Sequence, residues 1–285
     1  MTFVIERDVV CRAATFVIAR CLAYNDHTMT VTASSDRPAL KARVRVIQRL
    51  LLKAYGEPPR PAWAGTVAAP VAAPMAASAR SEAAHWNPID PLDELINTIL
   101  SQNTNDANRD RAYRALRATF PTWEAVRDAA TAKVIAAIRP AGLANQKGPR
   151  IQQVLRRITA ERGVLDLNFL RDLPTDEAKA WLTSLEGVGL KTASIVLLFA
   201  LGKPAFPVDT HIHRVTGRLG LLPPRTSADK AHTILAELMP PEWYHSFHLN
   251  VIEHGRQVCK ALRPQCERCV LQPQCDYYQG LQDGG

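Results

Sequence analysis

Four cysteines near the end of the chain constrain its fold more than any other feature. Their spacing is Cys259-x6-Cys266-x2-Cys269-x5-Cys275. So many thiols in so short a stretch indicate a bound metal rather than a set of disulfides. Structural zinc sites usually carry two close cysteine pairs, whereas only one is present here. A [4Fe–4S] cluster held by four thiolates fits the chemistry as well, so the spacing alone leaves both metals open.

Length and charge set the broad class of protein. The chain has 285 residues and a formal net charge of +8, enough for one large or two modest domains. A basic surplus fits a polyanionic partner such as nucleic acid, although many basic proteins bind none. The sequence contains no apolar run of about 18 residues or more, which excludes a transmembrane helix. Charged residues interrupt the first 23 residues, which argues against a signal peptide and leaves the cytoplasm, that of a bacterium by default, as the expected location.

The N-terminal part of the chain carries few structural signals. Residues 1–37 are expected to form a disordered extension, with weak strand signals at 3–5 and 16–18 and Met29 as an alternative start. Two further cysteines, Cys11 and Cys21, lie here as ordinary thiols. Residues 57–87 are rich in Pro and Ala without periodicity, so this stretch is predicted to be a linker.

Helical periodicity dominates the rest of the sequence. Residues 39–55 have apolar side chains on one helical face, and Lys41, Arg45, Arg49 and Lys53 line another. We expect that basic stripe to be a solvated face, with phosphate contact as the alternative. From Pro88 onward helical stripes follow one another, and no alternating strand pattern appears after residue 40, so the predicted fold class is all-α. Side chains suited to capping helices are Asp106, Thr122, Thr131 and Thr175.

A glycine-rich turn between two helical stretches gives the strongest local signal. One helix is predicted to end at Leu185, and the next starts near Leu190 after Gly187, Val188 and Gly189. Glycine permits positive φ values and a close approach of the backbone. The free N–H groups at the new helix start would form an anion site suited to a DNA phosphate. A purely structural turn remains the alternative.

Two charged residues follow this turn. Lys191 lies in the first turn of the second helix, where the helix dipole disfavours a cation. It is therefore a candidate amine nucleophile, with a solvated surface lysine as the alternative. Asp209 follows in Pro207-Val208-Asp209-Thr210-His211. It is predicted to cap the next helix, to act as a carboxylate beside the lysine, or to do both.

These features occur together, and in this order, in the endonuclease III family of helix-hairpin-helix DNA glycosylases and AP lyases. The segments Leu185–Ala193 and Val208–Ile212 and the complete cysteine spacing resemble that family. The resemblance extends from about residue 38 to 278, interrupted by the linker. It favours a [4Fe–4S] cluster over zinc at the four cysteines.

The resemblance implies an architecture of two helical domains that flank a DNA-binding cleft. A helical barrel with the helix-hairpin-helix would span 88–212. The cluster domain would combine the helix at 38–56 with residues 213–279, followed by a tail at 280–285.

The resemblance also implies an activity and its residues. Lys191 would attack C1′ of a damaged nucleotide with help from Asp209, and β-elimination through the Schiff base would cut the strand. The expected substrate is double-stranded DNA with oxidised pyrimidines or abasic sites, bound by a monomer. Leu143 matches the family's wedge, and His211 either faces the pocket or packs in the core. Further expected DNA contacts are Gly187, Val188, Gly189, Gln102, Asn103, Asn145 and Lys147.

One segment departs from the family pattern. The family commonly has Gln three residues before the Asp that corresponds to Asp106, whereas Asn103 stands there and Gln102 precedes it. The choice of lesion is therefore open.

Two other functions compete with this interpretation. A monofunctional adenine glycosylase of the MutY type would lack the lysine and extend much further beyond the cysteines. A non-catalytic or weakly active DNA-binding relative would need neither Lys191 nor Asp209.

Overall fold

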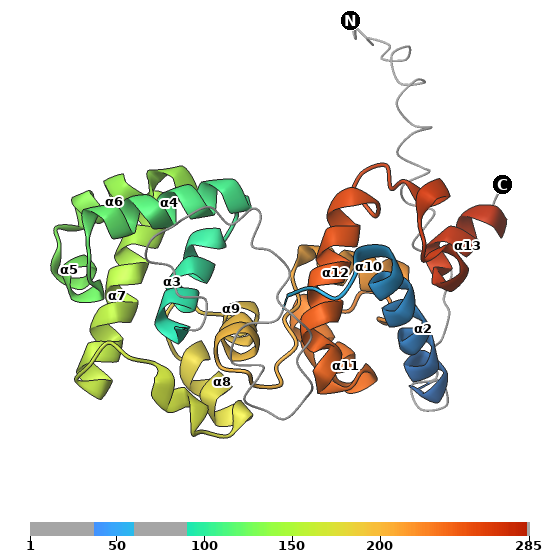
Figure 1. Cartoon of the computed structure of the whole chain (residues 1–285), viewed down its shortest axis with the longest axis horizontal. Coiled ribbons are helices and arrows are strands. Elements are labelled where there is room, and N and C mark those ends of the chain that lie inside the picture. The colour runs from blue at the N-terminus through green and yellow to red at the C-terminus, as the bar shows by residue number, and fades with distance from the viewer. Residues whose placement is uncertain (1–36, 60–89, 284–285) are drawn as a thin grey trace, which may run out of the picture. The chain divides into compact units, whose positions relative to one another are not determined.

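The computed structural model describes residues 37–59 and 90–283, and within these ranges every regular element is a helix (Figure 1). The all-α prediction is therefore confirmed. By their contacts, the described residues from Pro38 onward belong to one unit. None of the helices in the described ranges has both the length and the apolar character that a bilayer crossing requires.

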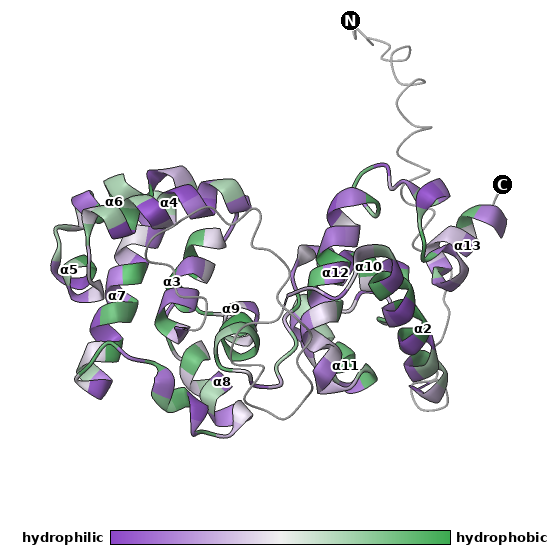
Figure 2. Cartoon of the chain, viewed as in Figure 1, coloured by the Kyte–Doolittle hydropathy of each residue, from purple (hydrophilic) through white to green (hydrophobic). Residues whose placement is uncertain are grey.

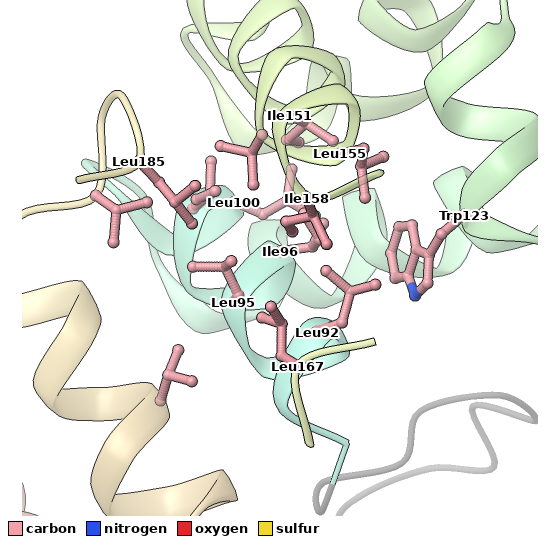
Figure 3. Close-up of a cluster of buried hydrophobic side chains, with 14 of the residues drawn as sticks. Leu92, Leu95, Ile96, Leu100, Trp123, Ile151, Leu155, Ile158, Leu167 and Leu185 are labelled. Atoms are coloured by element: carbon pink, nitrogen blue, oxygen red, sulfur yellow. The ribbon is translucent and has the colours of Figure 1, made fainter. Parts of the chain in front are cut away.

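Helices after the linker build a first hydrophobic core. They are α3 (Pro91–Ser101), α4 (Asp106–Thr119), α5 (Trp123–Asp128), α6 (Thr131–Ile138), α7 (Ala144–Arg162), α8 (Thr175–Thr183) and α9 (Leu190–Ile195), with short turns η3 (Arg139–Ala141) and η4 (Asn168–Arg171). Helix α3 is central and buried along nearly its whole length. Figure 3 shows its Leu95, Ile96 and Leu100 among Ile151 and Ile158 of α7.

A second core is built from the N-terminal helix together with the C-terminal helices. They are α2 (Arg37–Tyr55), α10 (Thr210–Arg218), α11 (Ala228–Leu238), α12 (Tyr244–Gln257) and α13 (Asp276–Asp283), with short turns η6 (Pro241–Trp243), η7 (Cys266–Arg268) and η8 (Gln272–Gln274). Val44, Ile47 and Leu51 of α2 pack with Val215 of α10 and Phe247 of α12. Figure 2 shows hydrophobic and hydrophilic residues alternating around these helices, as amphipathic packing requires.

The π-helical turn η5 (Val196–Ala200) continues α9 and contributes to both cores. Leu197 packs in the first core, whereas the adjacent Leu198 packs in the second. Phe206, Val208 and Ile212 also lie in the second core, so the change from one core to the other begins before the expected domain boundary at residue 212.

Helix caps agree with the sequence at some positions and differ at others. Thr122 caps α5 as predicted, since its side chain accepts a hydrogen bond from the Ala125 amide (3.2 Å). The cap of α4 is Asn105 rather than Asp106. Ala130 rather than Thr131 precedes α6, and the Thr131 hydroxyl instead donates to Gln152 (2.7 Å). Adjacent capping residues compete for one position, so a shift by one residue is the expected error of a sequence pattern.

Several predictions lie outside the described residues. They concern the extension at 1–36 with its weak strand signals, Cys11, Cys21 and Met29, and most of the linker at 57–87. The tail expected at 280–285 is helical as far as Asp283, because α13 extends through it.

Gly148 makes the close approach of α7 to α6 possible. A Cβ atom at Gly148 would lie 2.8 Å from Cγ1 of Ile135, a distance at which the Ile135 side chain or one of the two helices must shift. We predict that Gly148→Val lowers the free energy of unfolding by about 1–3 kcal/mol. Gly217 in α10 is the matched control, because a Cβ there meets nothing within 4 Å. Urea titration should show Gly217→Val within about 0.5 kcal/mol of the parent; equal losses in both variants would disprove the packing explanation.

Candidate active site

The turn between α8 and α9 is a tight hairpin. Gly187 has a φ of +77°, a left-handed conformation that favours glycine. The next residue, Val188, is buried and its amide donates to the Leu185 carbonyl (3.0 Å). The predicted turn is therefore present, although α8 ends at Thr183, two residues before Leu185.

Gly189, unlike Gly187, does not supply a positive φ to the turn. Its φ of −88° and ψ of 178° are extended values that other residues also adopt. No side chain caps α9 there, and a Cβ on Gly189 would meet nothing within 4 Å. Gly189 and Lys191 are both exposed. The start of α9 is thus an uncapped helix N-terminus, with an amine one residue further along.

Asp209 stands at the start of α10. Its carboxylate accepts a hydrogen bond from the Ile212 amide (2.8 Å), as predicted for a helix cap. The side chain is half-buried. The preceding residues Phe206, Pro207 and Val208 are buried, so the backbone that carries Asp209 is fixed by the second core.

Two histidines hold this backbone, and sequence analysis missed both. His232 Nδ1 donates to the Phe206 carbonyl (2.8 Å), and His248 Nδ1 donates to the Pro207 carbonyl (3.0 Å). His248 lies on the apolar face of α12 that carries Phe247 and Val251. A histidine within an apolar helix face was the signal available in the sequence.

The electrostatics of His248 connect it with both charged residues. Burial lowers the pKa of His248 to about 4, the Asp209 carboxylate opposes this shift, and the Lys191 ammonium adds to it. Burial also lowers the pKa of His232. Lys191 and Asp209 therefore act on one buried imidazole, which stays neutral near pH 7.

Gln102 and Asn103 differ although they are neighbours. The Gln102 amide donates to the Gly187 carbonyl (3.3 Å) and to the Thr192 hydroxyl (3.5 Å), and accepts from Arg150 (3.4 Å). It therefore braces the hairpin against the end of α3. Asn103 is exposed, with a φ of +53°. Gln102 is half-buried, so Asn103 is the more exposed of the two.

The loop before α7 contains three predicted contact residues with different environments. Leu143 is 46% exposed and has a φ of +49°, so it does not belong to the core. Asn145 is exposed. Lys147 is only 1% exposed and donates to two backbone carbonyls, and burial lowers its pKa to about 8. The side chain of Lys147 is therefore not exposed as the predicted direct DNA contact would require.

His211 packs against α12. Its Nδ1 lies 3.0 Å from the Arg214 guanidinium, which also donates to the Gly255 carbonyl (2.9 Å). A Cβ on Gly255 would lie 3.0 Å from His211 Nδ1. Burial lowers the pKa of His211. The packing alternative for this residue is the one that the structure supports.

The four C-terminal cysteines line one cavity. Cys259, Cys266, Cys269 and Cys275 line it together with Arg218 and other residues. Within residues 37–59 and 90–283, no three His, Cys, Asp or Glu side chains converge closely enough to hold a single ion. Four thiols that line one cavity could serve as sulfur ligands of a metal centre.

N–H donors surround the sulfur atoms of this cavity. Arg218 lies 3.3 Å from the Cys259 sulfur, and His254 Nε2 and the Leu271 amide each lie 3.4 Å from the Cys269 sulfur. Burial raises the pKa of the Cys269 thiol to about 11. Because thiolates are costly in such a site unless positive charge compensates them, the donor set suits a cationic metal centre.

Comparison with known proteins identifies the class. The model of the HhH-GPD superfamily of base excision DNA repair proteins matches residues 96–241. The chain belongs to this superfamily of helix-hairpin-helix DNA repair glycosylases.

Sequence and structural relatives give the particular family. Endonuclease III of Thermotoga maritima is 34% identical over 189 residues, which cover 66% of this chain and 84% of that protein. A protein of Arabidopsis thaliana named as a candidate DNA glycosylase is 38% identical over 182 residues, which cover 64% of this chain and 60% of the relative. A solved structure of a non-covalent endonuclease III–DNA complex matches with a TM-score of 0.65 and 27% identity, over 85% of this chain and 98% of that one. Within the superfamily, the chain is thus a homologue of endonuclease III.

Proposed function

We propose that this chain is a bifunctional DNA glycosylase and AP lyase that removes oxidised pyrimidines from double-stranded DNA. The proposal rests on an exposed lysine at the start of α9, Lys191, and on the half-buried carboxylate of Asp209 at the start of α10. Binding to DNA by the hairpin would need no such pair. The pair therefore supports catalysis over a purely DNA-binding relative.

The proposed chemistry begins with the neutral amine of Lys191. Its nitrogen attacks C1′ of the flipped nucleotide, and the bond from C1′ to the base breaks with the electron pair leaving on the base. The sugar ring then opens to a Schiff base. Loss of a C2′ proton from this intermediate expels the 3′ phosphate and cuts the strand. Asp209 either accepts the proton that the amine loses or stabilises the cationic sugar.

DNA is proposed to meet four features of this surface. The uncapped start of α9 after Gly187, Val188 and Gly189 would bind a backbone phosphate through its amides. Leu143 and Asn103 would enter the duplex to fill the space that the extruded nucleotide leaves. Asn145 is exposed beside Leu143 and is a candidate phosphate contact.

A [4Fe–4S] cluster is proposed for the cysteine cavity, held by Cys259, Cys266, Cys269 and Cys275. When bound, it would supply a covalent staple for a C-terminal segment with few buried residues of its own. These cysteines are remote in sequence from Lys191 and Asp209, and we assign the cluster no part in bond breaking.

A panel of duplexes tests the proposal as a whole. Thymine glycol, dihydrouracil, uracil and abasic sites should separate the classes of activity. We expect excision of the oxidised pyrimidines and cleavage at the abasic site. Excision without strand cleavage would identify a monofunctional enzyme, and binding without either reaction would identify a DNA-binding relative.

Lys191 should be required for strand cleavage. We predict that Lys191→Ala reduces cleavage of an abasic duplex to the rate without enzyme, because the Schiff base cannot form. Lys179 in α8 is a matched control, since it lies in the same hairpin but pairs with Asp176 (2.8 Å). A gel assay of both variants should show the loss only for Lys191→Ala; cleavage that survives there would assign the chemistry to another amine.

Asp209 should affect rate more than binding. We predict that Asp209→Asn lowers base excision by about 100-fold or more, which is typical for the loss of a general base. Asparagine caps helices as well as aspartate does, so the bond to the Ile212 amide and the fold should persist. Single-turnover excision and DNA affinity measured side by side test this. Weaker binding with an unchanged rate per bound complex would leave Asp209 as a cap only.

The purified protein should contain iron. We predict about four iron atoms per chain and a yellow-brown colour, since four thiolates hold a cubane cluster. Cys269→Ser should lose iron and lower the melting temperature, whereas Cys11→Ser should change neither. Elemental analysis that finds zinc and no iron would refute the cluster.

A further inference from the structure

Among the described residues, Lys147 is the buried lysine, and it contacts the backbone shortly before Asn103 and Leu143. It occupies the first turn of α7 and is 1% exposed. Its Nζ donates to the Leu100 carbonyl (2.7 Å) and to the Ala141 carbonyl (2.9 Å). A lysine so deeply buried does not bind a ligand in this conformation, so its role must be exerted through the backbone that it holds.

Each of these carbonyls stands at the end of a helical segment. Leu100 is the penultimate residue of α3, and Ala141 is the last residue of η3. The last carbonyls of a helix have no partner within it, and the helix dipole favours a cation beside them. One ammonium group therefore connects the C-terminal ends of two helical segments, at residues that are 41 positions apart in the sequence.

An unusual backbone conformation follows each anchored carbonyl. Asn103 lies three residues after Leu100 with a φ of +53°, and Leu143 lies two residues after Ala141 with a φ of +49°. Left-handed conformations are strained for residues other than glycine and persist where the surroundings hold them. Lys147 is the side chain that contacts the base of both loops.

A second contact from the same helix connects this pair with the hairpin. Arg150, one turn beyond Lys147, donates to Gln102 (3.4 Å), which in turn donates to the Gly187 carbonyl (3.3 Å). The end of α3 is thus held from α7 on one side and attached to the hairpin on the other.

We propose that Lys147 is a positioning residue that fixes the Asn103 loop and the Leu143 loop relative to each other, so that both side chains enter the duplex as a pair. This inference rests on the proposed function, in which these two side chains replace the extruded nucleotide. It assigns Lys147 to the step of nucleotide extrusion and not to bond breaking.

Lys147→Met tests the proposal, because methionine keeps the apolar stem and removes the donors. Lys203 provides a matched control: it is half-buried and donates to two carbonyls, those of Arg171 and Leu173, remote from both loops. Each variant leaves two carbonyls without their partner, so both should lose stability. Only Lys147→Met should release the two loops.

Hydrogen exchange measured by mass spectrometry on the full-length protein without DNA gives the first readout. We expect faster exchange in peptides covering 101–106 and 140–146 in Lys147→Met, and parent rates in both peptides in Lys203→Met. Release of only one loop, or the same change in both variants, would overturn the proposal. Should Lys147→Met fail to fold, Lys147→Gln, which retains an amide donor, should show a smaller release of the same two peptides.

The second readout compares two substrates. Excision of thymine glycol from duplex DNA should fall by about tenfold to 100-fold in Lys147→Met, as loss of positioning implies, while cleavage at an abasic site in a single strand stays near the parent rate. Equal losses on both substrates would refute the positioning role. If the parent protein itself processes no damaged DNA, the proposed function fails, and the exchange experiment still decides whether Lys147 couples the loops.

Discussion

The candidate active site depends on the short apolar turn η5, in which side chains that are adjacent in the sequence pack in different cores. Within η5, Leu197 lies in the first core and Leu198 in the second. The Leu201 amide donates to the Val196 carbonyl (3.1 Å), five residues earlier, which widens the helical turn. π-helical turns are rare and occur frequently at functional sites. Side chains of this run are buried in both cores. The position of the hairpin before it is therefore fixed relative to the segment after it that carries Asp209.

The two charged residues of the proposed chemistry differ in their exposure and in how firmly their backbone is held. Lys191 is exposed on the hairpin and free to meet a substrate, whereas Asp209 is half-buried on a backbone that His232 and His248 hold. Burial lowers the pKa of both imidazoles and so favours their neutral form, in which they hold the backbone beside the carboxylate without adding a competing cation. The same division recurs around α3, where Gln102 and Lys147 brace the backbone and Asn103 and Leu143 project from it.

The sequence predicted those parts of the structure that depend on local pattern. Helical periodicity predicted α2 closely, and Asp209 caps α10 as its position in the sequence predicted. The failures have physical causes. Lysine is rarely buried, so a DNA contact was the reasonable expectation for Lys147 until the two carbonyl partners were seen. Gln102 and Asn103 are adjacent residues with the same amide group. Only their neighbours in three dimensions decide which of the two forms hydrogen bonds within the protein. The π-helical winding of η5 has no signature in its apolar composition.

The amine of Lys191 is proposed to form the covalent intermediate with DNA. Borohydride reduction during reaction with an abasic duplex, followed by digestion and mass spectrometry, locates the amine that reacts. We expect a sugar remnant on the peptide that contains Lys191 and on no other peptide. A remnant on another amine, or no adduct from iron-loaded protein that binds the same duplex, would contradict it.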